Sequence, residues 1–121
     1  MQRRDRVVVK KILSEIDIAF DMLGDCEIDT FLADEKLKRA VGMTVINIGE
    51  LVKNITDELR SEHNEIPWKA IAGMRDIAAH KYQTLRMEDV YNTVIMDFPD
   101  LRKKLKAIIE SEICEGETNE N

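Results

Sequence analysis

The segment from Arg75 to Tyr82 combines a guanidinium, a carboxylate, an imidazole and a phenol within eight residues. Asp76 and His80 are four residues apart, so on a helix they share one face, where the carboxylate can orient the imidazole. Arg75 and His80 are five residues apart, about 140° around a helix, so one chain does not bring both to one substrate atom. Two copies related by a two-fold axis can do so. Spacing alone also allows purely structural roles for these residues. The histidine could cap the C-terminus of a helix, the arginine and aspartate could form a surface ion pair, and the tyrosine could anchor the core.

Apolar residues on both sides of this segment recur at steps of three and four, which predicts amphipathic helices. We expect Pro99 to break or kink the last part of the pattern. No stretch alternates as a strand does, so the sequence predicts an all-α, four- to five-helix up-and-down bundle. The predicted helices cover about residues 5–23, 31–60, 67–83, 90–94 and 100–113.

The chain has 121 residues, enough for one hydrophobic core, and its 44% hydrophobic and 35% charged residues are typical of a globular protein. We expect a single domain over residues 1–113 and an acidic tail over residues 114–121. The longest uncharged run, residues 40–49, is too short to span a bilayer. No basic-then-apolar N-terminal segment with a cleavage site is visible, so we expect the protein to act in the cytoplasm.

The net charge of −6 does not suggest a nucleic-acid partner, but the charge is unevenly distributed. Five glutamates and no basic residue lie from Glu110 onward, whereas residues 67–86 carry four basic residues and one aspartate. Composition therefore does not exclude a phosphate-bearing partner. No phosphate-binding loop, dinucleotide-binding motif or nucleophile elbow is present, and two histidines without clustered cysteines predict neither a metal site nor a cofactor.

The segment around Arg75 and His80 resembles the motif of the HEPN superfamily, an arginine followed by a polar residue and, four to six positions on, by a histidine. A tyrosine two residues after the histidine, here Tyr82, resembles the HepT branch, the toxin half of nucleotidyltransferase–HEPN (MNT–HEPN) toxin–antitoxin pairs. Lys81 is a departure, because that family often has a small residue there. Further segments extend the resemblance over about residues 5–113: Ile48-Gly49-Glu50, Ile66-Pro67-Trp68, Met74-Arg75-Asp76 and Phe98-Pro99-Asp100-Leu101.

The resemblance implies a homodimeric, metal-independent endoribonuclease with an active site composed from both subunits. It implies that His80 acts as general base or acid on an RNA 2′-hydroxyl or leaving oxygen, that Arg75 binds the scissile phosphate and that Asp76 orients one of these side chains. Lys81 would add a phosphate contact or distort the turn. A partner nucleotidyltransferase would neutralise the toxin by transferring AMP to Tyr82.

Two other interpretations remain open. The first is a non-catalytic HEPN subunit that binds substrate for a nucleotidyltransferase or serves as its scaffold; because a scaffold needs neither Arg75 nor His80, the motif favours the enzyme. The second is an unrelated structural helical bundle, for which a stable monomer would be evidence. The sequence also leaves open whether a dimer would form through the apolar stripe of the second predicted helix or through the fourth helix.

Overall fold

A computed structural model describes residues 1–80 and 86–120, with side chains described for residues 1–74 and 86–111. The described part of the chain contains no strand, which confirms the all-α prediction. None of its helices combines the length and the apolar content needed to cross a membrane. The helices are α1 (Arg3–Leu23), α2 (Ile28–Ala33), α3 (Glu35–Lys53), α4 (Asp57–Glu62), α5 (Trp68–His80), α6 (Met87–Asn92), the π-helical turn η2 (Thr93–Asp97) and α7 (Phe98–Glu120).

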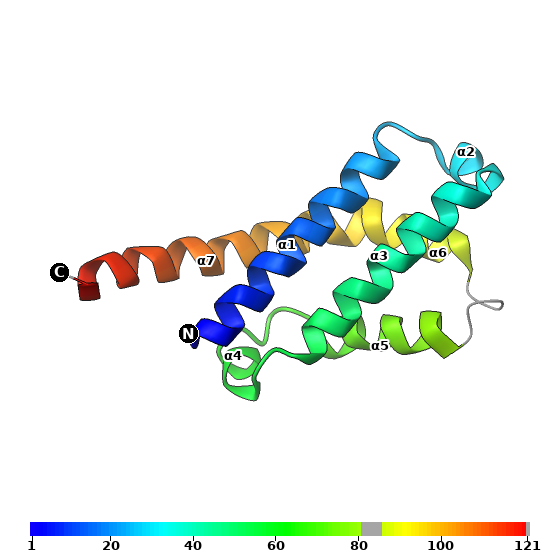
Figure 1. Ribbon diagram of the computed structural model, residues 1–121. Coiled ribbons are helices and arrows are strands. Elements are labelled where there is room, and N and C mark those ends of the chain that lie inside the picture. The colour runs from blue at the N-terminus through cyan, green and yellow to red at the C-terminus, as the bar shows by residue number, and fades with distance from the viewer. Residues whose placement is uncertain (81–85, 121) are drawn as a thin grey trace.

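The long helices α1, α3, α5 and α7 form a bundle in which successive long helices run in opposite directions (Figure 1). α3 packs against both α1 and α5, and α1 also packs against α7. The short helices α2 and α6 contact each other at one end of the bundle, where the ring centroids of Phe31 and Tyr91 lie 5.4 Å apart. The order of packing around the bundle is therefore α5, α3, α1 and α7.

The core consists largely of the apolar residues whose spacing predicted helices. Each buried aliphatic side chain contributes about 1.5–3 kcal/mol through removal of its surface from water. Over the described side chains, one face of each long helix supplies these residues, as expected where apolar residues recur at steps of three and four. The buried members include Val9, Ile12 and Ile16 of α1, Val41 and Ile48 of α3, Trp68 and Ile71 of α5, and Leu101, Leu105 and Ile108 of α7.

The prediction of one helix over residues 31–60 is wrong, because two N-caps divide this segment. The carboxylate of Asp34 accepts a hydrogen bond from the backbone N–H of Leu37 at 3.0 Å and starts α3. The hydroxyl of Thr56 accepts one from the N–H of Leu59 at 3.3 Å and starts α4. Aspartate and threonine favour the N-cap over the helix interior, so the chain turns at both places.

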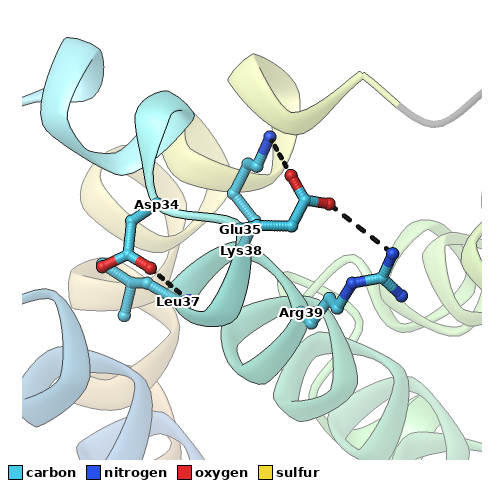
Figure 2. A network of polar contacts seen from close by, with 5 residues as sticks. All are labelled: Asp34, Glu35, Leu37, Lys38 and Arg39. Carbon is cyan, nitrogen blue, oxygen red and sulfur yellow. Dashed lines mark hydrogen bonds and ion pairs between the residues drawn. The ribbon is translucent and has the colours of Figure 1, made fainter.

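Figure 2 shows the polar contacts at the start of α3, where Asp34 caps the helix. The carboxylate of Glu35 lies 3.0 Å from Nζ of Lys38 and 3.6 Å from Nη2 of Arg39. The hydrogen bond from Lys38, its positive charge and then that of Arg39 hold the pKa of Glu35 below its ordinary value. Glu35 is exposed, so these ion pairs add little stability, and the cap determines where α3 begins.

The chain stays helical across Pro99, which we expected to break or kink the pattern. The residues just before it form the π-helical turn η2, and Pro99 is the second residue of α7. The π-helical turn just before Pro99 is the kind of local adjustment that accommodates a proline inside a continuous helix, because it changes the pairing of the backbone groups around the missing N–H. α7 then runs to Glu120, beyond the expected end at Ile113. No later proline stops it, and glutamate is a good helix former.

Asp5, near the start of α1, is a buried carboxylate with 1% of its surface exposed. Its oxygens accept hydrogen bonds from the backbone N–H of Thr56 at 3.0 Å and from the Thr56 hydroxyl at 2.5 Å. We expect Asp5→Ala to lower the free energy of unfolding by about 1–3 kcal/mol, because it leaves the Thr56 N–H without this partner. Urea denaturation followed by circular dichroism measures the loss.

Asp21→Ala is the matched control, because Asp21 is exposed on the same helix. It should change the free energy of unfolding by less than about 0.5 kcal/mol. Equal stability of the two variants would contradict the role of Asp5 in joining α1 to the start of α4.

Candidate active site

The start of α5 is anchored by Ile66 and Trp68, which are both buried. Between them, Pro67 directly precedes the first helical residue, a position where its fixed backbone angle suits the helix. The indole N–H of Trp68 donates a hydrogen bond to the carbonyl oxygen of His63 at 3.0 Å. These contacts fix the rotation of α5 about its axis. They therefore determine the directions in which the later positions of the helix face.

One face of α5 contains the backbone positions of Asp76 and His80. Positions 69, 73, 76 and 80 follow one another at steps of four, three and four, which places them along a single face of the helix. Lys69 at the start of this face is exposed, and a Cβ added at Gly73 would meet no packing neighbour within 4 Å. Over its described residues, this face is therefore open to solvent and accessible to a large substrate.

Arg75 occupies a different face of α5. It follows Trp68 by seven residues and Ile71 by four, and those two residues are buried. The continuous helix from Trp68 to His80 keeps Arg75 and His80 five residues apart, so their backbone positions face different directions. Lys81 and Tyr82, the other two candidate residues, lie outside the described residues.

The segment Ile48-Gly49-Glu50 lies on α3, the helix against which α5 packs. Ile48 and Gly49 are buried, whereas Glu50 is exposed. Glu50 lines a hollow of about 300 Å³ between α1 and α3, together with Lys11, Ser14 and Asn47. The first two residues of this segment therefore belong to the core, and only Glu50 is available to solvent.

A second hollow, which the sequence did not predict, lies between α5 and the segment formed by η2 and α7. Its volume is about 330 Å³. The one feature of the sequence that could have indicated this hollow is the apolar pair Ile95-Met96. Both of these side chains lie at the surface in the structure. The apolar residues that line the hollow include Ala70, Ile71 and Met74 of α5, Met96 of η2, and Phe98 and Leu101 of α7.

Comparison with known protein families defines the class of this protein. Residues 12–108 match the family described as "Ribonuclease HepT-like", and this range contains all of α5. The chain therefore belongs to the HepT-like ribonuclease family, as the resemblance of its motifs indicated.

Several relatives match over nearly their whole length. "Putative RNase TTE0752" of Caldanaerobacter subterraneus is 34% identical over 88% of this chain and 96% of its own length. "Putative RNase MJ0127" of Methanocaldococcus jannaschii is 32% identical over 97% of this chain and 96% of its own length. "Probable ribonuclease HepT" of Thermococcus cleftensis is 31% identical over 89% of this chain and 98% of its own length. No solved structure matches the chain.

Proposed function

We propose that this protein is a metal-independent endoribonuclease that acts as the toxin of a toxin–antitoxin pair in the cytoplasm. The observation that carries the proposal is the match of residues 12–108 to HepT-like ribonucleases. RNA is then the substrate. The face of α5 that includes positions 76 and 80 is open at its described positions 69 and 73, which supports this proposal because an RNA strand needs an accessible surface on which to bind.

The active site is shared between two subunits. Because Arg75 and His80 occupy different faces of α5, a single chain does not place both on one phosphate. Two chains related by a two-fold axis bring together two imidazoles and two guanidiniums. Two imidazoles are sufficient for separate base and acid roles, which is why no metal ion is required for the proposed reaction.

In this reaction, one His80 accepts the proton of the RNA 2′-hydroxyl, and the 2′-oxygen attacks the adjacent phosphorus. The bond between phosphorus and the 5′-oxygen breaks, and the second His80 donates a proton to that oxygen. Arg75 stabilises the negative charge that develops on the phosphate oxygens, Asp76 orients His80 or Arg75, and Lys81 adds a phosphate contact. The products carry a 2′,3′-cyclic phosphate and a 5′-hydroxyl.

A cognate minimal nucleotidyltransferase serves as the antitoxin. It transfers AMP to Tyr82, two residues after His80 in the sequence. The added phosphate and nucleoside block the RNA phosphate through both charge and volume. Because Tyr82 follows His80 so closely in the sequence, modification of this tyrosine is a direct way to keep the toxin inactive.

The experiment that tests the proposal is cleavage of labelled RNA by the purified protein in excess chelator. Cleavage that leaves 2′,3′-cyclic phosphate ends, together with growth arrest when the chain is expressed alone, is the expected result. A mass spectrum must show that Tyr82 is unmodified. Absence of cleavage by unmodified protein on several classes of RNA would instead favour a non-catalytic partner subunit of a nucleotidyltransferase.

Lys69 offers a test of the RNA path, because it is exposed at the start of the face that includes positions 76 and 80. We expect Lys69→Gln to raise KM for RNA by about 3- to 10-fold with little change in kcat, and to reduce the slope of log KM against log salt by about 0.7. Lys103→Gln, at an exposed position of α7, is the control and should leave both quantities unchanged. Equal effects of the two substitutions would contradict an RNA path along α5.

A further inference from the structure

The charged residues of α1 are separated by sign between its two halves. Residues 3–11 contain five basic residues and one acidic residue, Asp5, whereas residues 12–23 contain three acidic residues and no basic one. Asp5 is buried and bound to Thr56, so it presents no carboxylate at the surface. The start of α1 is therefore strongly positive on a chain of net charge −6. Its basic residues, which we call the α1 basic patch, are Arg3, Arg4, Arg6, Lys10 and Lys11.

The α1 basic patch is accessible, and its charges are not neutralised by neighbouring carboxylates. All its members except Arg6 are exposed to solvent. Nε of Arg6 is covered and has no hydrogen-bond partner in the described part of the chain. Among the described residues, no member of the patch forms an ion pair. Basic residues of other helices do form such pairs: Lys38 with Glu35, Arg102 with Asp17, and Lys104 with Asp100.

The position of the patch is unfavourable for α1 itself. The N-terminus of a helix is the positive end of its dipole, so basic residues in the first turn and acidic residues in the last turn both destabilise the helix. α1 has both, because Arg3 and Arg4 begin the helix and Asp21 lies in its last turn. A local charge preference that is contradicted without a compensating contact indicates a functional role.

The patch forms one continuous surface on the side of α1 that faces away from the core. Steps of three and four residues join Arg3, Arg6 and Lys10 in one row. Arg4 and Lys11, which are seven residues apart, form a second row beside it. The nine residues from the first to the last member span about 12 Å along the helix axis, which is enough to contact more than one phosphate of a nucleic-acid strand.

We propose that the α1 basic patch is a second RNA-binding surface, which holds a part of the RNA substrate away from the phosphate that is cleaved. The proposal rests on the proposed function for its ligand. Five unpaired cations on one surface attract a polyanion and release its counterions when it binds. A chain that is negative overall binds RNA only where its surface is locally positive, and the patch supplies such a surface.

The patch is separate from the face of α5 that includes positions 76 and 80. α3 lies between α1 and α5 in the packing of the bundle, and position 80 lies at the far end of α5, about 18 Å along the helix from Trp68. α4 lies beside the start of α1 (Figure 1), and its residues Asp57 and Glu58 are exposed. The positive surface therefore does not continue across α4 to α5. Only an RNA that extends well beyond the cleaved phosphate can reach the patch.

The composition of this surface favours RNA over a protein as its ligand. Val7 is the one large apolar side chain of residues 3–11 that is exposed, at 46%. Protein–protein interfaces have an apolar centre that excludes charged residues, and the patch has none. RNA carries phosphates at regular intervals, so a row of cations binds it without an apolar anchor.

The kinetics of Lys10→Glu with two substrates test the inference. The substrates are a long single-stranded RNA and a dinucleotide, which is too short to reach the patch. We expect KM for the long RNA to rise by about 5- to 10-fold with kcat unchanged, and the slope of log KM against log salt to become smaller. kcat/KM for the dinucleotide should stay the same. Lys103→Glu, at an exposed position of α7, is the matched control and should change neither substrate's kinetics.

Arg4→Glu separates RNA binding from helix stability. A carboxylate in the first turn of α1 is favoured by the helix dipole, so the thermal unfolding midpoint should stay the same or rise. KM for the long RNA should nevertheless rise as it does for Lys10→Glu. A lower unfolding midpoint together with unchanged KM would show that the patch is structural and would overturn the inference.

Binding of labelled long RNA, measured by fluorescence anisotropy, distinguishes failure of the inference from failure of the proposed function. A chain that cleaves RNA with the same KM in Lys10→Glu and Arg4→Glu would remain a ribonuclease and would refute the second surface. A chain that binds RNA through the patch but cleaves none would support the inference and refute the catalytic function. Weaker binding of the cognate nucleotidyltransferase by Lys10→Glu, with RNA binding unchanged, would assign the patch to a protein partner and overturn the inference.

Discussion

Replacing His80 by alanine is expected to lower the rate of RNA cleavage by about 10²–10⁴-fold, the usual effect of removing a general acid or base. The loss should appear in kcat, because the proposed mechanism assigns proton transfer to His80 and assigns the binding of RNA to the basic residues. The measurement is cleavage of labelled RNA in excess chelator, with analysis of the product ends. Circular dichroism should show that the variant is folded, since position 80 is the last residue of α5.

The chain provides a matched control, because it has only two histidines. His63 precedes α5, its side chain is 29% exposed, and its Nδ1 lies 3.6 Å from Oε1 of Glu65. His63→Ala should cleave RNA at the rate of the unaltered protein, since the hydrogen bond to Trp68 uses the backbone carbonyl of His63 and survives the substitution. Cleavage by His80→Ala at the unaltered rate would refute the proposed mechanism.

The second large expected effect is that of AMP transfer to Tyr82. Incubation with the cognate nucleotidyltransferase, ATP and Mg²⁺ should add one AMP to each chain: the phenol oxygen attacks the α-phosphorus of ATP, and pyrophosphate and a proton are released. We expect RNA cleavage to fall by about 10²-fold or more, because the AMP phosphate competes with the RNA phosphate for Arg75. Intact mass and peptide mapping measure the modification, and the cleavage assay measures its effect.

The two tyrosines of the chain allow a matched comparison. The hydroxyl of Tyr91 donates a hydrogen bond to the carbonyl oxygen of Cys26 at 2.7 Å, and its ring packs against Phe31, so it already has a structural role. Tyr91→Phe should still accept AMP, whereas Tyr82→Phe should accept none and should continue to cleave RNA in the presence of the nucleotidyltransferase. An unaltered chain that stays unmodified under these conditions would exclude this regulation.

The sequence by itself determined the fold class, the core and the family. Apolar residues at helical spacing, such as Val9, Ile12 and Ile16, predicted buried helix faces, because the side chains that leave water must lie on one side of each helix. The order of short motifs around Arg75 and His80 indicated the family, and the match over residues 12–108 confirms it. These features depend on local spacing, which can be read along the chain.

Only the tertiary structure decided where α3 gives way to α4 and which surfaces remain open. The division between α3 and α4 depends on Thr56, whose backbone N–H and hydroxyl bind Asp5, 51 residues earlier in the chain. The packing of Trp68 and Ile71 in the core determines the direction in which the face of α5 with position 80 points. The exposure of Met96 beside a cavity results from the separation of α5 and α7 in the bundle. Such features arise from contacts between residues far apart in the sequence, and helical periodicity, which relates only residues within a few turns, does not contain them.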